Sequence, residues 1–304
     1  MSMIDFVGGN KEYSIHGVSY IGNPKSNTAM YITKKIESKI HALKGVKNCL
    51  VFLESGIKVP EDIVRDHNFV FSSTPQLEYT RFVTKLAEDK RNRDNKTPYN
   101  RSPQGYYISK DAIIGANALI EPNVFIGPGV IIGDNAVILN GSVIKNSIIG
   151  NGFIANENAT IGTNGFTMTE DENNNKIRIP TLGRVVIGNN VEIGAHDNVC
   201  CGSGGDTVIG DNAKISAFVN IGHDSYIDNN VEITAGCILG GFTNIGENTF
   251  LGLNCTIKNR VSIGRNVVIG MGANVITSFG DNLTVAGNPA RVIKEGKIEK
   301  EQNY

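Results

Sequence analysis

The stretch VIGDNAKISAFVNIGHDSYIDNNVEITAGCILGGFTNIGENTFLGLNCTIKNRVSIGRNVVIGMGANVI, residues 208–276, decides the fold. Every sixth residue in it is aliphatic without a break: Ile209, Ile215, Ile221, Ile227, Ile233, Leu239, Ile245, Leu251, Ile257, Ile263, Ile269 and Val275. Four residues after each aliphatic from Ile209 to Ile269 stands a small residue, from Ala213 to Ala273. One large and one small inward residue per short strand would fill a narrow prism. Three hexads then close one coil, and residues 18 apart stack at the ~4.8 Å spacing of neighbouring strands.

The same period continues toward the N-terminus and is interrupted twice. It runs from Ile108 to Ile144, and Ile187, Ile193 and Val199 keep it. Residues 163–184 are polar and out of period, and a shorter insertion lies near residues 202–206. Loops that leave a regular solenoid usually lie on its binding face, so we expect these two to do so. The alternative is a loop that the solenoid merely tolerates.

The residues before the repeat are patterned differently and predict a small α/β domain. Apolar runs predict strands at 49–53 and 69–73, and helical patterns cover 28–43 and 75–90. The charged, turn-rich segment that follows predicts a linker. The expected domains are therefore residues 1–90, a linker at 91–106, a β-helix at 107–279 that carries the loop 163–184, and a C-terminal extension at 280–304, whose tail is a short polar helix or strand.

Composition narrows the class of protein. The 304 residues include 29 basic and 30 acidic side chains, a balance that gives no support to nucleic-acid binding. The chain shows no secretory signal and no apolar stretch near the ~18 residues of a membrane span, so we expect a cytoplasmic protein. Five cysteines without a CxxC pair predict neither a zinc site nor a disulfide framework.

Several segments resemble the UDP-3-O-acylglucosamine N-acyltransferase family. They are VSYIGNPK (18–25), FVFSSTPQLEYTRFV (69–83), IGTNGF with RIPTLGRVVIGNNVEIGA (161–195), and VNIGHDSYIDNN (219–230). The resemblance implies a left-handed parallel β-helix, mainly β overall, with an N-terminal domain that helps to hold the uridine of a nucleotide-linked amino sugar. It implies substrate-binding residues at Tyr20, Asn23 and Lys25, and at Phe166 in the loop.

The chain departs from that family at three places. Ser26 stands where the family has a second uracil-binding aromatic, and Arg260 stands where it has a second histidine. The segment TVAGNPARVI, residues 284–293, resembles instead the end of trimeric acetyltransferases that use acetyl-CoA. That likeness implies an acyl-CoA donor near Ala286, Gly287, Asn288 and Arg291. The alternative is the lipid A enzyme itself, which takes its acyl group from an acyl-carrier protein.

Acyl transfer to an amine needs a base and a donor for the oxyanion, and His223 is the best candidate for the base. It stands between the inward residues Ile221 and Ser225, so its side chain should face outward, and it matches the catalytic histidine of both families. Asp224 could orient the imidazole or be an ordinary turn residue. By the same likeness, the Gly241 N–H, one coil later, would bind the oxyanion and border the CoA site.

His196-Asp197 repeats the His-Asp dipeptide on an earlier coil, and we expect His196 to contact the acceptor. Cys237 and Cys255 fall in the small inward column, which packing explains. No metal is expected, and the families imply a homotrimer. Two further alternatives stay open: a γ-class carbonic anhydrase, which needs three histidine ligands where the solenoid has only His196 and His223, and a scaffold that binds no CoA.

Overall fold

The computed structural model describes residues 4–8 and 11–296 and consists of two compact units. Unit 1 comprises Met1–Lys96, Phe166–Gly183 and Ser203–Gly205, and unit 2 comprises Thr97–Gly165, Arg184–Gly202 and Asp206–Tyr304. Each unit has its own core.

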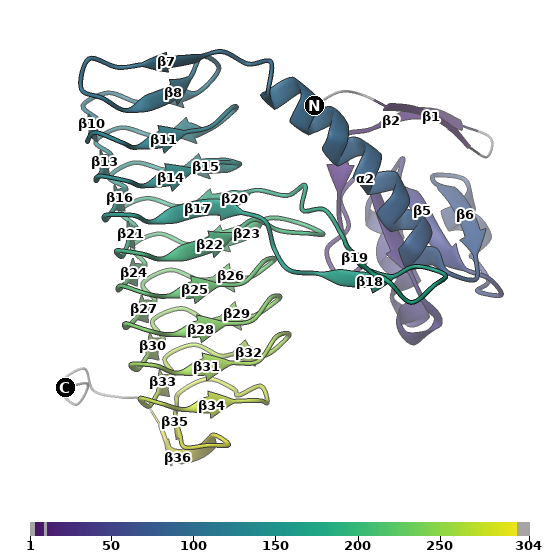
Figure 1. Ribbon diagram of the computed structural model, residues 1–304. Coiled ribbons are helices and arrows are strands. Elements are labelled where there is room, and N and C mark those ends of the chain that lie inside the picture. The colour runs from purple at the N-terminus through teal and green to yellow at the C-terminus, as the bar shows by residue number, and fades with distance from the viewer. Residues whose placement is uncertain (1–3, 9–10, 297–304) are drawn as a thin grey trace. The chain divides into compact units, whose positions relative to one another are not determined.

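Unit 2 is the predicted left-handed parallel β-helix, whose coils lie one above another in Figure 1. Sheet I contains β9 (Ile113–Ile114), β12 (Ile131–Ile132), β15 (Ser147–Ile149), β20 (Val185–Ile187), β23 (Thr207–Ile209), β26 (Tyr226–Ile227), β29 (Asn244–Ile245) and β32 (Ser262–Ile263). Sheet II contains β10 (Leu119–Ile120), β13 (Val137–Ile138), β16 (Ile154–Ala155), β21 (Glu192–Ile193), β24 (Lys214–Ile215), β27 (Glu232–Ile233), β30 (Phe250–Leu251), β33 (Val268–Ile269), β35 (Leu283–Ala286) and β36 (Arg291–Glu295). Sheet III contains β7 (Tyr99–Arg101), β8 (Tyr107–Ser109), β11 (Phe125–Ile126), β14 (Val143–Ile144), β17 (Thr160–Thr163), β22 (Asn198–Cys200), β25 (Asn220–Ile221), β28 (Ile238–Leu239), β31 (Thr256–Ile257) and β34 (Asn274–Val275).

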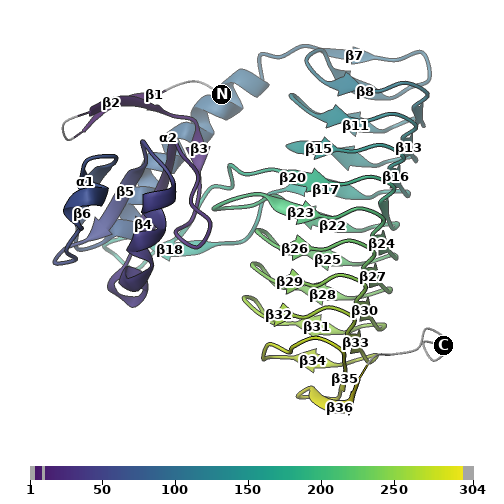
Figure 2. The ribbon, with the colours of Figure 1, turned by 180° about the vertical axis from the view of Figure 1, so that it is seen from behind.

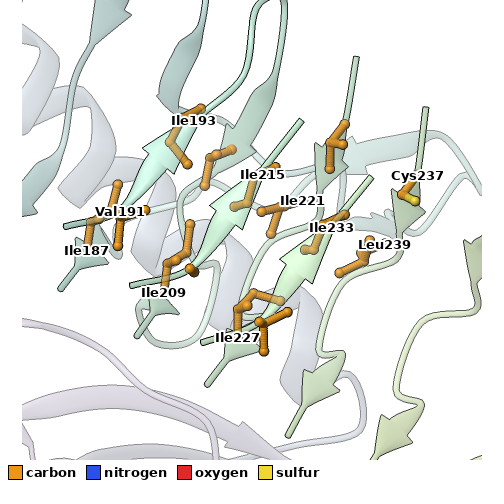
Figure 3. Close-up of a cluster of buried hydrophobic side chains, with 14 of the residues drawn as sticks. Ile187, Val191, Ile193, Ile209, Ile215, Ile221, Ile227, Ile233, Cys237 and Leu239 are labelled. Atoms are coloured by element: carbon orange, nitrogen blue, oxygen red, sulfur yellow. The ribbon is translucent and has the colours of Figure 1, made fainter. Parts of the chain in front are cut away.

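The core of the β-helix is the aliphatic column that the six-residue period predicted. Figure 3 shows Ile209, Ile215, Ile221 and their neighbours stacked in the interior, where they are at most 3% exposed. Cys237 and Cys255 lie in the same interior with their Sγ atoms 3.5 Å apart. Burial of these side chains stabilises the solenoid by roughly 1.5–3 kcal/mol each.

Two boundaries of the β-helix differ from those predicted. The expected linker, 91–106, contains the end of a helix that reaches Asp94 and the strand β7, which pairs antiparallel with β8. At the other end, β35 pairs in parallel with β33, so the solenoid continues beyond residue 279. The tail forms β36, antiparallel to β35, and residues 297–304 lie outside the described residues.

Unit 1 is built on a parallel sheet in the order β3 (Gly17–Val18), β4 (Thr28–Ile32), β5 (Leu50–Glu54) and β6 (Asn68–Ser72). It also contains β1 (Ile4–Gly8), β2 (Lys11–Ile15), the 3-10 helix η1 (Lys34–Gly45), α1 (Glu61–Val64), α2 (Pro75–Asp94), β18 (Met168–Glu170) and β19 (Lys176–Arg178). Figure 2 shows α2 beside β4 and β5, against which the buried face of this helix packs. No helix among the described residues has the length and apolar character needed to cross a membrane.

Two predictions for this unit need correction or completion. The predicted helix at 28–43 begins instead as the strand β4, whose two faces are both covered: Ala29 is buried in one core of unit 1, and Met30 and Ile32 are buried in the other. The predicted loop 163–184 contains the antiparallel hairpin β18–β19. Its Ile179 and Leu182 belong to the core of unit 1.

Candidate active site

His223 lies where the chain turns from sheet III into sheet I, between β25 and β26. Its neighbours Ile221 and Ser225 point into the prism and are at most 1% exposed, so the imidazole points outward, as predicted. Its side chain is 14% exposed, against 1% for Asp224. The Nδ1 atom lies 2.7 Å from Oδ2 of Asp224. A carboxylate acceptor at Nδ1 favours the tautomer with its proton there, in which Nε2 carries the lone pair and can act as a base.

Two glycines lie against the His223 side chain. A Cβ atom added to Gly241 would lie 2.6 Å from Nε2, and one added to Gly165 would lie 2.8 Å from the His223 Cβ. Any side chain at either position would displace the ring. Gly241 was predicted beside His223, whereas Gly165 was not assigned a role, although it stands in the quoted motif IGTNGF.

The backbone N–H of Gly241 lies at the same corner as His223, between β28 and β29. Within the described part of the chain, the structure records no acceptor for this N–H. An N–H of this kind beside a candidate base can stabilise a developing oxyanion.

Phe242 and Arg260 extend the site along the same corner. The Phe242 ring meets the imidazole edge to face, with centroids 5.3 Å apart at 86°. The Arg260 guanidinium carbon lies 4.4 Å from the centre of the Phe242 ring, in a cation–π contact. Sequence reasoning noted Arg260 only as a departure from a family pattern and missed Phe242. The available signal was an aromatic residue at a turn position where this solenoid usually has asparagine.

His196 and Asp197 do not repeat the His223-Asp224 arrangement. The Asp197 carboxylate points into the prism and accepts the N–H groups of Gly194 at 2.8 Å and Val219 at 2.7 Å. Burial raises the pKa of the Asp197 carboxyl to about 7. The His196 ring instead stacks on Phe218, with centroids 5.2 Å apart and an interplanar angle of 7°. This pair lies at the corner between sheets II and III, a different corner from that of His223.

The predicted acceptor residues other than His196 lie in unit 1. Tyr20 and Asn23 form a tight turn in which the Asn23 N–H donates to the Tyr20 carbonyl at 3.0 Å. The Lys25 N–H donates to Ser19 Oγ at 3.3 Å, and the Tyr20 side chain is partly exposed. Phe166 is 72% exposed, and Arg178 lies over its ring at 5.0 Å.

The residues predicted near the CoA donor follow the last parallel strand of sheet II. Ala286 ends β35, and Gly287 has a φ of 99°, a conformation that favours glycine. The Asn288 Oδ1 accepts a hydrogen bond from the Asn274 side chain at 3.1 Å, and Arg291 Nη1 donates to the Ala290 carbonyl at 2.8 Å. These contacts close the end of the solenoid; a role in donor binding stays a prediction.

Family models of bacterial transferase repeats match parts of the β-helix. The family model described as bacterial transferase hexapeptide (six repeats) matches residues 111–146 and 206–241, and that of the hexapeptide repeat of succinyl-transferase matches residues 243–278. UDP-3-O-acylglucosamine N-acyltransferase of Coxiella burnetii (strain Dugway 5J108-111) is 43% identical over 76 residues, which are 25% of this chain and 22% of the relative. The Dechloromonas aromatica protein of the same name is 50% identical over 66 residues, 22% of this chain and 19% of the relative. The chain thus spans about a fifth of the length of these curated relatives.

Solved structures extend the likeness along the β-helix. The UDP-N-acetylglucosamine acyltransferase of Bacteroides fragilis matches with a TM-score of 0.52 and 26% identity, over 64% of this chain and 74% of that one. LpxA of Acinetobacter baumannii matches with a TM-score of 0.58 and 21% identity, over 64% of this chain and 73% of that one, which shows the same fold. The chain therefore carries the bacterial transferase hexapeptide repeat along its β-helix and is similar, over about a quarter of its length, to UDP-3-O-acylglucosamine N-acyltransferases.

Proposed function

We propose that this protein transfers an acyl group from a thioester to the amine of a nucleotide-linked amino sugar, in the synthesis of a bacterial glycan or lipopolysaccharide. The observation that carries the proposal is the arrangement at His223: a carboxylate fixes Nδ1, and Nε2 lies over the backbone of Gly241. A base beside a backbone N–H is the minimum that acyl transfer to an amine requires.

The proposed reaction is a direct attack in two steps. The sugar amine adds to the thioester carbonyl carbon while Nε2 of His223 accepts the amine proton. The Gly241 N–H donates to the resulting oxyanion, and the Asp224 carboxylate stabilises the imidazolium through Nδ1. Collapse of the intermediate breaks the C–S bond, and the departing thiolate takes the proton from Nε2, so the products are an amide and a free thiol.

The acceptor follows from the names of the relatives. The curated proteins that match are UDP-3-O-acylglucosamine N-acyltransferases, which supports a UDP-linked amino sugar as the acceptor class. In unit 1, Tyr20, Asn23, Lys25 and Phe166 are the residues we propose for its recognition. His196 is a further candidate at the corner between sheets II and III.

The donor is proposed to be an acyl-CoA such as acetyl-CoA, bound near Ala286, Gly287, Asn288 and Arg291. The support is the segment 284–293, which turns back on the last coil as β35 and β36. The second candidate is N-acylation of UDP-3-O-acylglucosamine itself from an acyl-carrier protein, which the printed names of the relatives favour. We further propose a homotrimer, because a closed symmetric assembly is the common way for a repeat protein of this kind to complete a shared site. Light scattering of the purified protein measures its mass.

The proposal is tested by replacing the base. Wild-type protein and His223→Asn are incubated with acetyl-CoA, a longer acyl-CoA or an acyl-carrier protein thioester, together with UDP- and dTDP-linked amino sugars, and thiol release is followed. We expect the substitution to lower kcat by about 10²-fold to 10⁴-fold, the usual contribution of general base catalysis, with an unchanged melting temperature. Near-normal turnover by His223→Asn would refute His223 as the base. Thiol release only from the carrier-protein thioester would establish the second donor.

A further inference from the structure

Arg260 occupies a backbone conformation in which this protein otherwise prefers asparagine. Among the described residues, twenty non-glycine residues have positive φ; fifteen are asparagine, and the others are His196, Phe218, Asp224, Phe242 and Arg260. Arg260 has a φ of 65°. A long side chain there costs roughly 1–2 kcal/mol relative to a relaxed conformation, so a gain elsewhere should explain its presence.

The contact with Phe242 leaves the hydrogen-bonding edge of Arg260 available. The guanidinium carbon lies over the Phe242 ring at 4.4 Å, and a contact with a ring face uses none of the N–H donors as a hydrogen bond to an oxygen acceptor. Within the described chain, no acidic side chain pairs with Arg260, and the residue is exposed. The nearest acidic member of this corner, Asp224, is already bound to His223. A preorganised, unpaired arginine of this kind is suited to two parallel hydrogen bonds with a phosphate.

The position of Arg260 relative to His223 distinguishes between two possible phosphates. One aromatic ring, Phe242, contacts both the imidazole and the guanidinium. In a nucleotide-linked amino sugar, the diphosphate is bonded to the same sugar ring that carries the amine. The phosphate of a CoA or carrier-protein thioester is separated from the reacting carbonyl by the whole pantetheine arm. A group this close to the base therefore fits the acceptor.

On the basis of the acyltransferase function proposed above, we propose that Arg260 binds the diphosphate of the nucleotide-sugar acceptor, with Phe242 holding its guanidinium in place. Arg260 then orients the sugar so that its amine faces Nε2 of His223. Lys258, two residues earlier and also exposed, adds positive charge to the same coil.

The test uses Arg260→Asn in the full-length protein, because asparagine is the residue that this backbone conformation normally carries. Arg265→Asn is the matched control: it removes the same charge from an exposed arginine at another corner, one that pairs with Asp281. Calorimetric titrations with UDP, dTDP, their nucleosides and CoA are compared with the wild type. We expect Arg260→Asn to weaken nucleoside diphosphate binding by about 10-fold to 100-fold, the effect of losing hydrogen bonds to a charged group. Nucleoside and CoA binding, and the control, should not change.

The outcomes separate this proposal from the proposed function. An unchanged or higher melting temperature with a raised acceptor KM supports diphosphate binding. Unchanged diphosphate affinity in a variant that still acylates amino sugars overturns the role of Arg260 and leaves the acyltransferase intact. Loss of CoA binding alone assigns Arg260 to the donor and also overturns the proposal. Wild-type protein that binds no nucleoside diphosphate overturns both.

Discussion

The placement of the His223 imidazole depends on residues that contribute no side chain. Gly165 lies against the Cβ and Cγ atoms of His223, Gly241 lies against Nε2 and Cε1, and Asp224 is hydrogen-bonded to Nδ1. Backbone without a Cβ at both positions leaves room for the imidazole on the outer surface of the β-helix.

Gly241→Ala tests the position of the base without removing the oxyanion donor, because alanine keeps the backbone N–H. The added Cβ would lie 2.6 Å from Nε2 and must displace the ring, and a misplacement of about 1 Å costs roughly 100-fold in rate. We expect kcat to fall by about that factor while the protein stays folded. Gly280→Ala is the control, because its Cβ would meet no atom within 4 Å. Equal activity of the two variants would contradict the geometry.

We expect Asp197 to make the stability of the β-helix depend on pH, because burial raises the pKa of its carboxyl group. Its pKa is raised by burial from 3.8 to about 7, so between these values the folded protein binds the proton more tightly than the unfolded chain does. The protonated carboxyl makes its full contribution to the free energy of unfolding below pH 3.8, and this contribution is lost as pH rises to about 7. At about 1.4 kcal/mol per pKa unit, the loss amounts to a few kcal/mol. Urea unfolding of the wild type and Asp197→Asn from pH 4 to pH 8 measures how the free energy of unfolding changes with pH. The same pH dependence in both proteins would contradict the assignment to Asp197.

At the scale of the elements, the inward columns could be predicted and the corners could not. The aliphatic period identified the buried strands because an interior position accepts only a narrow range of volumes. One feature was hidden: Ile131 pairs with Ile148 rather than with a residue 18 later, since one residue is missing from that coil. The strand β4 was predicted as a helix because its apolar residues are buried on both faces, which removes the alternation that marks a strand.

The corners show why the candidate site was only partly predictable. Between sheets I and II, asparagines of successive coils bind one another, as Asn212 does Asn230 at 2.8 Å, and this regular corner follows from the repeat. His223 and Asp224 were predicted from their outward phase and their match to a family motif, and Gly241 was predicted because residues 18 apart must stack. Gly165 escaped because it lies at the start of the predicted loop 163–184, where the six-residue period no longer assigns a register. The cation–π contact of Phe242 with Arg260 depends on side-chain directions that no period specifies.

At the scale of the whole molecule, a segment that interrupts the β-helix in sequence completes the core of unit 1. Ile179 and Leu182 pack with Val18, Leu50 and Val83, and within the same unit Arg81 pairs with Glu172 at 2.5 Å. The predicted binding loop is therefore also a structural part of the N-terminal unit. Its stability depends on residues more than 80 positions away in the sequence.

Ile179→Ala should consequently destabilise unit 1 and leave the solenoid unchanged. Ile179 is 2% exposed, and removal of a buried isoleucine side chain beyond Cβ costs about 2–5 kcal/mol. Hydrogen exchange resolves the effect by region: the amides of β5 and α2 should exchange faster, while those of β25 and β28 keep their protection. Ile113→Ala is the control, because this isoleucine of the β-helix is 60% exposed and its truncation should change stability by less than about 0.5 kcal/mol. Faster exchange in the solenoid strands of Ile179→Ala, or none in α2, would show that the segment is not part of the cooperative core of unit 1.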